Sequence, residues 1–188
     1  MRKLLLISMM IVISLLFVLS TGWVCAQNQS SAESNQQDLV ELGLSYFRLG
    51  MFSDAIQTLK KGLEGNTSDK TGWQSLAAAY RAQGLYNEAE ETYQLVLRLD
   101  DKDPRVWFEI GNLYYDMRDY QLAIDAQRRL IHKYPDSSKV PDAFLNIASS
   151  QQEMGDSKAS KQTLENLLEK YPKSDAAKKA RQRLANIK

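Results

Sequence analysis

The side chains that most often catalyse reactions or bind metals are scarce in this sequence. His132 is the only histidine and Cys25 the only cysteine among 188 residues. A zinc site built from protein ligands alone and a disulfide framework both need more of these residues, so both are excluded. A serine nucleophile would need a base and a local motif such as Gly-x-Ser-x-Gly, which does not occur. His132 is predicted in the last turn of a helix, where a cation complements the helix end.

Other chemical motifs are also missing. Neither the Gly-x-Gly-x-x-Gly fingerprint nor a phosphate-binding Gly-Lys-Ser/Thr loop is present. Carboxylates such as Glu88, Glu90 and Glu91 fall on a predicted solvent face of a helix. With 24 basic and 23 acidic residues, the chain has no bulk attraction to nucleic acid. We therefore expect a non-enzymatic protein without cofactor or metal, whose chemistry is that of binding.

The first residues have the pattern of an export signal, which we assign to residues 1–26. Arg2 and Lys3 precede an apolar run from Leu4 to Leu19, and Val24-Cys25-Ala26 matches a cleavage site after Ala26. Two alternatives stay open. Cys25 would be lipidated if this were a lipoprotein signal, although Val24 is larger than that signal prefers, or the run could remain as an uncleaved anchor. We expect an exported, periplasmic protein.

The remainder of the chain is organised by a period of 34 residues. Ala55, Ala89 and Ala123 keep this spacing, and so do Tyr46, Tyr80 and Tyr114. A polar spacer at 27–35 precedes the repeats, and apolar residues at helical spacing recur within each unit. The sequence predicts an all-α domain over 36–188, with units at 36–69, 70–103, 104–137 and, after a short insertion, 141–174. A last amphipathic helix at 175–187 caps the array.

The best-formed unit contains Trp73, Leu76, Ala77, Tyr80, Gly84 and Ala89 at the positions of a known repeat pattern. In this it resembles the tetratricopeptide repeat (TPR) family, which implies a solenoid of helical hairpins with a concave groove. Small residues allow the two helices of a hairpin to approach. We expect Gly43, Ala77, Gly111 and Ala148 to face Ala55, Ala89, Ala123 and Ser160.

Three residues depart from the family pattern. Gln127 stands where the family has an aromatic residue or Leu, which would loosen the third unit or turn this edge toward a partner. Arg118 replaces a turn glycine, so either a non-glycine residue holds a strained turn or the turn moves to Asp119. Gln151 replaces the tyrosine of the fourth unit. We interpret these departures as tolerated variation.

The cap helix carries a basic face made of Lys178, Lys179, Arg181, Arg183 and Lys188. We interpret it as a solvated face favoured by the helix dipole, with contact to anionic lipid or peptidoglycan as the alternative function. No aromatic residue lies between these cations, which argues against nucleic-acid binding.

Two Tyr-Pro-x-Ser segments, at 134–137 and 171–174, together with the leader, resemble repeats of bacterial envelope proteins. The likeness is to the carboxy-terminal domain of the periplasmic Tol–Pal cell-division coordinator and to the TPR lipoprotein of the outer-membrane β-barrel assembly machine. Residues 27–35 are too short and polar for the trimerising coiled coil of that coordinator, so we expect a monomer.

In the TPR family the first helix of each unit lines the groove, which implies where a protein or peptide partner would bind. Aromatic residues at these positions are candidates for apolar contacts, and arginine and amide residues are candidates for polar ones. The alternative is that such a residue covers a neighbouring helix. Val40 and Leu44 stand where chaperone-binding members have Lys and Asn, so that carboxylate clamp is absent. The predicted site residues are Phe47, Arg48, Gln74, Arg81, Phe108, Asn112 and Tyr115.

Overall fold

The computed structural model describes residues 34–65, 68–100 and 102–186, so the predicted signal peptide and most of the spacer lie outside the described residues. Within the described ranges all regular secondary structure is helical. Residues 34–48 form a helical segment. The elements that follow are α2 (Phe52–Gly62), α3 (Lys70–Ala82), α4 (Tyr86–Leu99), α5 (Pro104–Asp116), α6 (Tyr120–Lys133), α7 (Val140–Glu153), α8 (Ser157–Lys170) and α9 (Asp175–Asn186).

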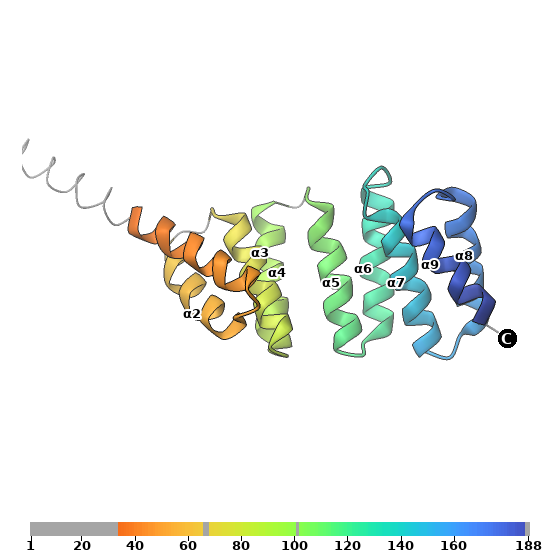
Figure 1. Cartoon of the computed structure of the whole chain (residues 1–188), viewed down its shortest axis with the longest axis horizontal. Coiled ribbons are helices and arrows are strands. Elements are labelled where there is room, and N and C mark those ends of the chain that lie inside the picture. The colour runs from red at the N-terminus through yellow and green to blue at the C-terminus, as the bar shows by residue number, and fades with distance from the viewer. Residues whose placement is uncertain (1–33, 66–67, 101, 187–188) are drawn as a thin grey trace, which may run out of the picture.

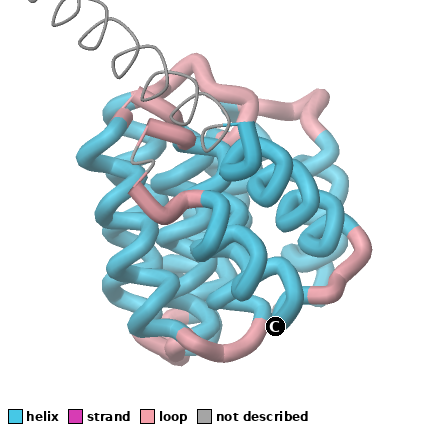
Figure 2. Tube along the Cα trace, turned by 90° about the vertical axis from the view of Figure 1, so that its left-hand side faces the viewer, coloured by secondary structure: helices cyan, strands magenta, loops and turns pink. Residues whose placement is uncertain are grey.

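The helices stand side by side in one elongated row that follows chain order from residue 34 to α8, and α9 packs against α7 and α8 at the end of the row (Figure 1). Consecutive helices pack as hairpins, and the connecting loops gather at the two ends of the helices (Figure 2). Buried side chains form successive clusters along the row, because each hairpin covers its apolar face with the next one. The predicted all-α helical solenoid is confirmed.

The contacts inside each hairpin depend on small residues. Ser160 faces Ala148 as predicted, because its hydroxyl donates to the Ala148 carbonyl at 2.9 Å, whereas the two glycines have other nearest partners. A Cβ atom added to Gly43 would lie 2.6 Å from Leu59 Cγ, and one added to Gly111 would lie 2.7 Å from the side-chain amide carbon of Gln127. The glycines therefore face a position one helical turn beyond the predicted alanines. Ala55, Ala89 and Ala123 are nevertheless almost fully buried.

Carboxylates begin several of the helices. Asp69, Asp103, Asp119 and Asp156 each accept a hydrogen bond from a backbone N–H in the first turn of the following helix. The helix α2 has no such cap. That helix begins at Phe52, and its N-cap is Met51, which makes no side-chain hydrogen bond.

The turn inside the third unit keeps its place despite the missing glycine. Gly50, Gly84 and Gly155 have φ angles of 74°, 74° and 81°, and Arg118 takes the equivalent position with φ of 63°. The first of the two predicted alternatives is therefore correct: a non-glycine residue holds a left-handed conformation.

The two glutamine departures lie inside the array. Gln127 is 1% exposed, and its Nε2 donates to the Phe108 carbonyl at 3.1 Å, so it does not turn this edge toward a partner. The Gln127 Oε1 has no partner. Gln151 is also buried, and its Oε1 accepts a hydrogen bond from the Thr163 hydroxyl at 2.8 Å.

Candidate partner-binding surface

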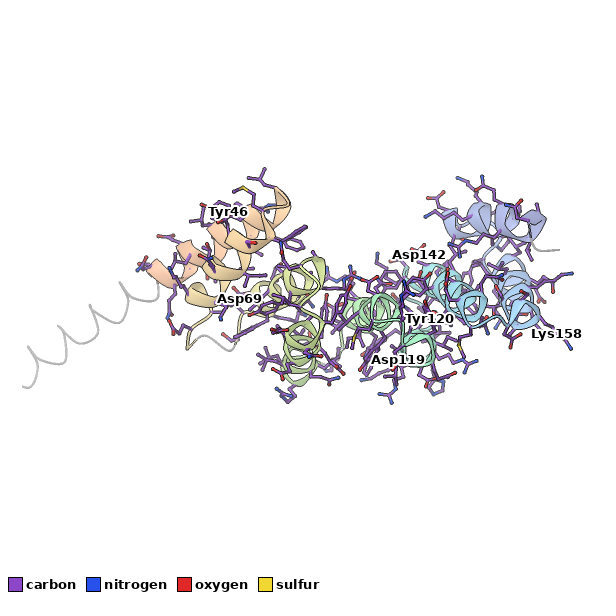
Figure 3. All side chains as sticks on the ribbon, turned by 90° about the horizontal axis from the view of Figure 1, so that it is seen from below. Tyr46, Asp69, Asp119, Tyr120, Asp142 and Lys158 are labelled. Carbon is purple, nitrogen blue, oxygen red and sulfur yellow. The ribbon has the colours of Figure 1, made fainter. Side chains whose placement is uncertain are left out.

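The row of helices bends. In Figure 3 the segment 34–48 and α9 stand on the same side at the two ends, whereas α4 and α6 lie on the opposite side. Along the inside of this bend, α5 contacts α3 and α7, and α9 contacts α7. We call the surface formed by segment 34–48, α3, α5, α7 and α9 the inner surface. It carries two hollows.

The first hollow, of about 300 Å³, lies between α3 and α5. Phe47, Ala78 and Val106 supply apolar walls, and the remaining lining residues are Gln74, Ser75, Arg81, Tyr93, Arg105 and Glu109. Phe47 also packs against Phe52, with ring centroids 5.7 Å apart in a T-shaped arrangement. The hollow thus combines an apolar interior with a polar rim, as sites for protein segments commonly do.

A buried carboxylate fixes one rim of the first hollow. The Asp103 side chain accepts hydrogen bonds from Gln74 Nε2 at 3.0 Å and from Arg105 Nη2 at 2.9 Å. Burial acts to raise the pKa of Asp103, but the hydrogen bonds from Arg105 and Gln74 outweigh it and hold this pKa at about 2. Asp103 therefore stays ionised and ties α3 to the start of α5.

Arg81 forms a second connection between the same helices. Its guanidinium lies 3.4 Å from a Glu109 carboxylate oxygen and 3.6 Å from one of Asp116. Beneath these charges, the Tyr93 hydroxyl has no hydrogen-bond partner. Burial, followed by the nearby Glu109 carboxylate, raises the pKa of Tyr93 well above its usual range, so the phenol stays neutral.

Polar contacts continue from α5 to α7. Asn146 Nδ2 donates to Asn112 Oδ1 at 2.7 Å, and the Tyr115 hydroxyl donates to a Glu153 carboxylate oxygen at 3.5 Å. Burial is the main cause that raises the pKa of Tyr115, and Glu153 adds to it. Polar side chains thus join α3 to α5 through Asp103 and Arg81, and α5 to α7 through Asn112 and Tyr115. Arg183 joins α7 to α9 in the same way, and we call these contacts together the inner ladder.

The second hollow, of about 370 Å³, lies toward α9. Ala148 and Leu164 form its apolar part, and Tyr115, Ser149, Gln152, Glu153, Ser160, Arg183 and Asn186 line the rest. Arg183 Nη1 donates to the Leu145 carbonyl at 3.3 Å and to the Ser149 hydroxyl. Arg183 is exposed, as the predicted basic face requires, and its side chain also joins α9 to α7.

The other predicted site residues lie apart from the hollows. Phe108 packs on the cluster of Leu130, Val140 and Ala143, with Lys139 Nζ 5.1 Å from its ring centroid, so it covers a neighbouring helix. Arg48 is exposed and donates to the Ser45 hydroxyl at 3.2 Å. Of the seven predicted residues, the first hollow gathers Phe47, Gln74 and Arg81, and the second includes Tyr115.

Within the described ranges, no group of three or more His, Cys, Asp or Glu side chains is placed to hold a metal ion. The same part of the chain contains no helix that combines the length and apolar character of a membrane span.

Models of the tetratricopeptide repeat match residues 39–61, 105–137 and 142–174, and a further TPR model matches residues 77–117. The chain belongs to the TPR family. Its hairpins are TPR units, and the inner surface is formed by the first helices of these units and by the capping helix. TPR scaffolds are generally non-catalytic and bind protein partners, which is the class of function that the family assigns to this chain.

Two relatives illustrate the range of proteins that contain similar repeats. The type IV pilus assembly protein PilF of Pseudomonas aeruginosa is 26% identical over 141 residues, which cover 68% of this chain and 55% of PilF. The general transcriptional corepressor ssn6 of Schizosaccharomyces pombe is 40% identical over 83 residues, which cover 44% of this chain and 6% of the corepressor. The chain thus spans about half of one relative and a small part of the other.

Solved structures share the TPR fold. A crystal structure of MamA aligns with a TM-score of 0.67 at 24% identity and covers 74% of each chain. A PilF structure from P. aeruginosa aligns with a TM-score of 0.61 at 22% identity and covers 81% of this chain and 72% of PilF. At these identities the likeness concerns the fold alone. The closer resemblance to the Tol–Pal coordinator and to the β-barrel assembly lipoprotein stays a prediction.

The TPR cap helix presents fewer free cations than its sequence predicts. Arg181 Nη2 donates to the Pro172 carbonyl at 3.0 Å, and Lys178 Nζ lies 2.7 Å from an Asp175 carboxylate oxygen. Lys188 lies outside the described residues. Contact of this helix with peptidoglycan or anionic lipid stays a prediction.

Proposed function

We propose that this chain is a non-enzymatic TPR scaffold of the bacterial cell envelope that binds a protein segment along its inner surface. The observation that carries the proposal is the pair of hollows, each with apolar walls and a polar rim. A segment that lies across α3, α5, α7 and α9 would place one side chain in each hollow. Shape and apolar burial would supply affinity, and the polar rims would supply specificity.

The inner ladder supports this proposal because it holds the helices at fixed offsets before any partner binds. Asp103 joins α3 to α5, Asn112 joins α5 to α7, and Arg183 joins α7 to α9. A surface that is already ordered loses less conformational entropy on binding. Residues Phe47, Gln74, Arg81 and Tyr115 are the contacts that we propose for the partner.

The envelope location rests on two observations. Residues 1–26 have the pattern of an export signal, and the repeats resemble a type IV pilus assembly protein over most of the chain. Mass spectrometry of the protein purified from its native cells tests this location. A new N-terminus after Ala26, or a lipid on Cys25, supports export, and a cytosolic chain with an intact leader contradicts it.

The groove is tested with Ala78→Arg, which fills the first hollow without altering a ladder residue. Gln94→Arg is the matched control, because Gln94 is exposed on α4, on the outer side. Crosslinking in intact cells, followed by mass spectrometry, compares both variants with the wild type. We expect Ala78→Arg to lose crosslinked proteins that Gln94→Arg retains. Equal crosslinking in two folded variants, checked by circular dichroism, would refute groove binding.

A further inference from the structure

Arg183 differs in its partners from the two arginines that line the first hollow. Arg81 faces two carboxylates, and Arg105 is paired with Asp103 at 2.9 Å. Among the residues that the structure describes, no carboxylate lies within 4 Å of the Arg183 guanidinium. Among these residues its guanidinium therefore forms no ion pair, although the exposed Glu153 lines the same hollow.

Neutral groups hold the Arg183 side chain in place. Both hydrogen bonds use Nη1, with the Leu145 carbonyl and the Ser149 hydroxyl as acceptors. The Ser149 hydroxyl in turn donates to the Leu145 carbonyl at 2.9 Å, which orients it. The Nε and Nη2 donors are not used by these contacts, and the side chain forms part of the wall of the second hollow. A positioned guanidinium with free donors matches a carboxylate.

The rest of the second hollow is consistent with a carboxylate ligand. Gln152 and Asn186 line its wall, and each side-chain amide has two N–H donors. Gln152 Nε2 uses one of them in a hydrogen bond to the Ser157 hydroxyl at 3.4 Å. Glu153 is the one acidic residue of the lining, and its carboxylate accepts a hydrogen bond from the Tyr115 hydroxyl. Glu153 lies one helical turn beyond Ser149 in the same lining, and its carboxylate is more than 4 Å from the Arg183 guanidinium, which leaves that guanidinium open to a ligand carboxylate.

We propose that the second hollow binds a carboxylate of the partner segment through Arg183, with Gln152 and Asn186 as additional donors. This inference rests on the proposed function and adds the chemistry of one contact. The bound segment would then place an acidic group next to α9 and an apolar side chain in the first hollow.

The test uses a random peptide library with free carboxyl termini, selected on the full chain. Selected peptides are synthesised with each Asp or Glu changed to the amide, and separately with an amidated C-terminus, so that side-chain and terminal carboxylates are distinguished. Fluorescence anisotropy measures their binding to the wild type, to Arg183→Gln and to the control Arg181→Gln. Removal of the critical carboxylate should weaken binding to the wild type and to Arg181→Gln about tenfold or more. It should change binding to Arg183→Gln little.

A second variant covers the case in which Arg183→Gln disturbs the fold. Asn186→Asp places a carboxylate three residues from Arg183 on the same helix, where it can pair with the guanidinium. This variant should fold and should lose the preference for acidic peptides.

Two results would overturn the inference, and they differ from failure of the scaffold. Equal effects of carboxylate removal in the wild type and Arg183→Gln would refute it, as would an unchanged acidic preference in Asn186→Asp. If no selected peptide loses affinity for Ala78→Arg or for Gln152→Trp, which fills the second hollow, the proposed function itself is wrong.

Discussion

Replacement of Gln127 by leucine should stabilise the protein. Gln127 is 1% exposed between α5 and α6, its Nε2 donates to the Phe108 carbonyl, and its Oε1 has no partner. The first unit already shows how leucine fits this position, because Leu59 packs against Gly43 as Gln127 packs against Gly111. The leucine therefore needs no new space.

The magnitude follows from the groups that are removed. An unsatisfied buried carbonyl costs about 1–3 kcal/mol, and the lost hydrogen bond to Phe108 is worth roughly 1 kcal/mol. The Phe108 carbonyl lies inside α5 and keeps its helical hydrogen bond. Apolar contacts of leucine add to the gain. The free energy of unfolding should rise by about 1–2 kcal/mol, and each kcal/mol should raise the melting temperature by about 2–4 °C.

Urea unfolding followed by circular dichroism measures this change, with an unchanged dependence on urea as the sign that the native fold is retained. Gln151→Leu is the matched control. Gln151 is also buried, but its Oε1 accepts a hydrogen bond from the Thr163 hydroxyl, so the leucine would remove that hydrogen bond and lower stability. A destabilised Gln127→Leu, or equal effects of the two substitutions, would refute this account of the buried amide.

Three further substitutions test other parts of the structure. Arg118→Gly should raise the free energy of unfolding by about 1 kcal/mol, because the φ of 63° suits glycine; a loss of stability in urea would contradict this. Ala89→Leu should lower it by about 1–3 kcal/mol, since Ala89 is fully buried, and a wild-type melting temperature would show that the site is not closely packed. Asp103→Asn should cost about 1–2 kcal/mol near neutral pH. The pKa of Asp103 in the folded protein is about 2, below its ordinary 3.8. This stabilisation is therefore present above pH 3.8 and disappears as the pH falls through 2. Urea unfolding at a series of pH values should show that the free energies of unfolding of the variant and the wild type converge near pH 2.

The sequence is sufficient for the fold because the repeat spacing is regular. A period of 34 residues at Ala55, Ala89 and Ala123 leaves few alternatives to stacked helical hairpins. The facing partners of Gly43 and Gly111 were misplaced by one turn, because residues one turn apart lie on the same side of a helix. Spacing alone does not distinguish them, and Leu59 and Gln127 show the true register.

The candidate site is less predictable, because contacts between units depend on how far one helix slides along the next. The 34-residue spacing fixes which residues are equivalent between units, but it does not fix how far neighbouring helices are shifted along each other. Asn112 meets Asn146, 34 residues later, although the insertion before α7 shifts the equivalent position of the fourth unit by three residues. Helical spacing placed Arg183 on the basic face of the cap helix but did not reveal that its side chain meets Ser149. In the sequence, such contacts between units could be recognised from two polar residues in neighbouring units whose repeat positions differ by one helical turn.

The inner ladder also decides which substitutions can test binding. Arg81→Glu, the obvious charge reversal in the groove, would bring a third carboxylate next to Glu109 and Asp116 and remove a connection between α3 and α5. A lost interaction could then result from a changed helix offset. Ala78 lines the same hollow and forms no ladder contact. Ala78→Arg therefore changes the space that is open to a partner, while Arg81 and Asp103 still hold α3 and α5 in their relative positions. Because TPR units contact only their neighbours, a ladder variant should alter the geometry locally, whereas a hollow variant should alter occupancy alone.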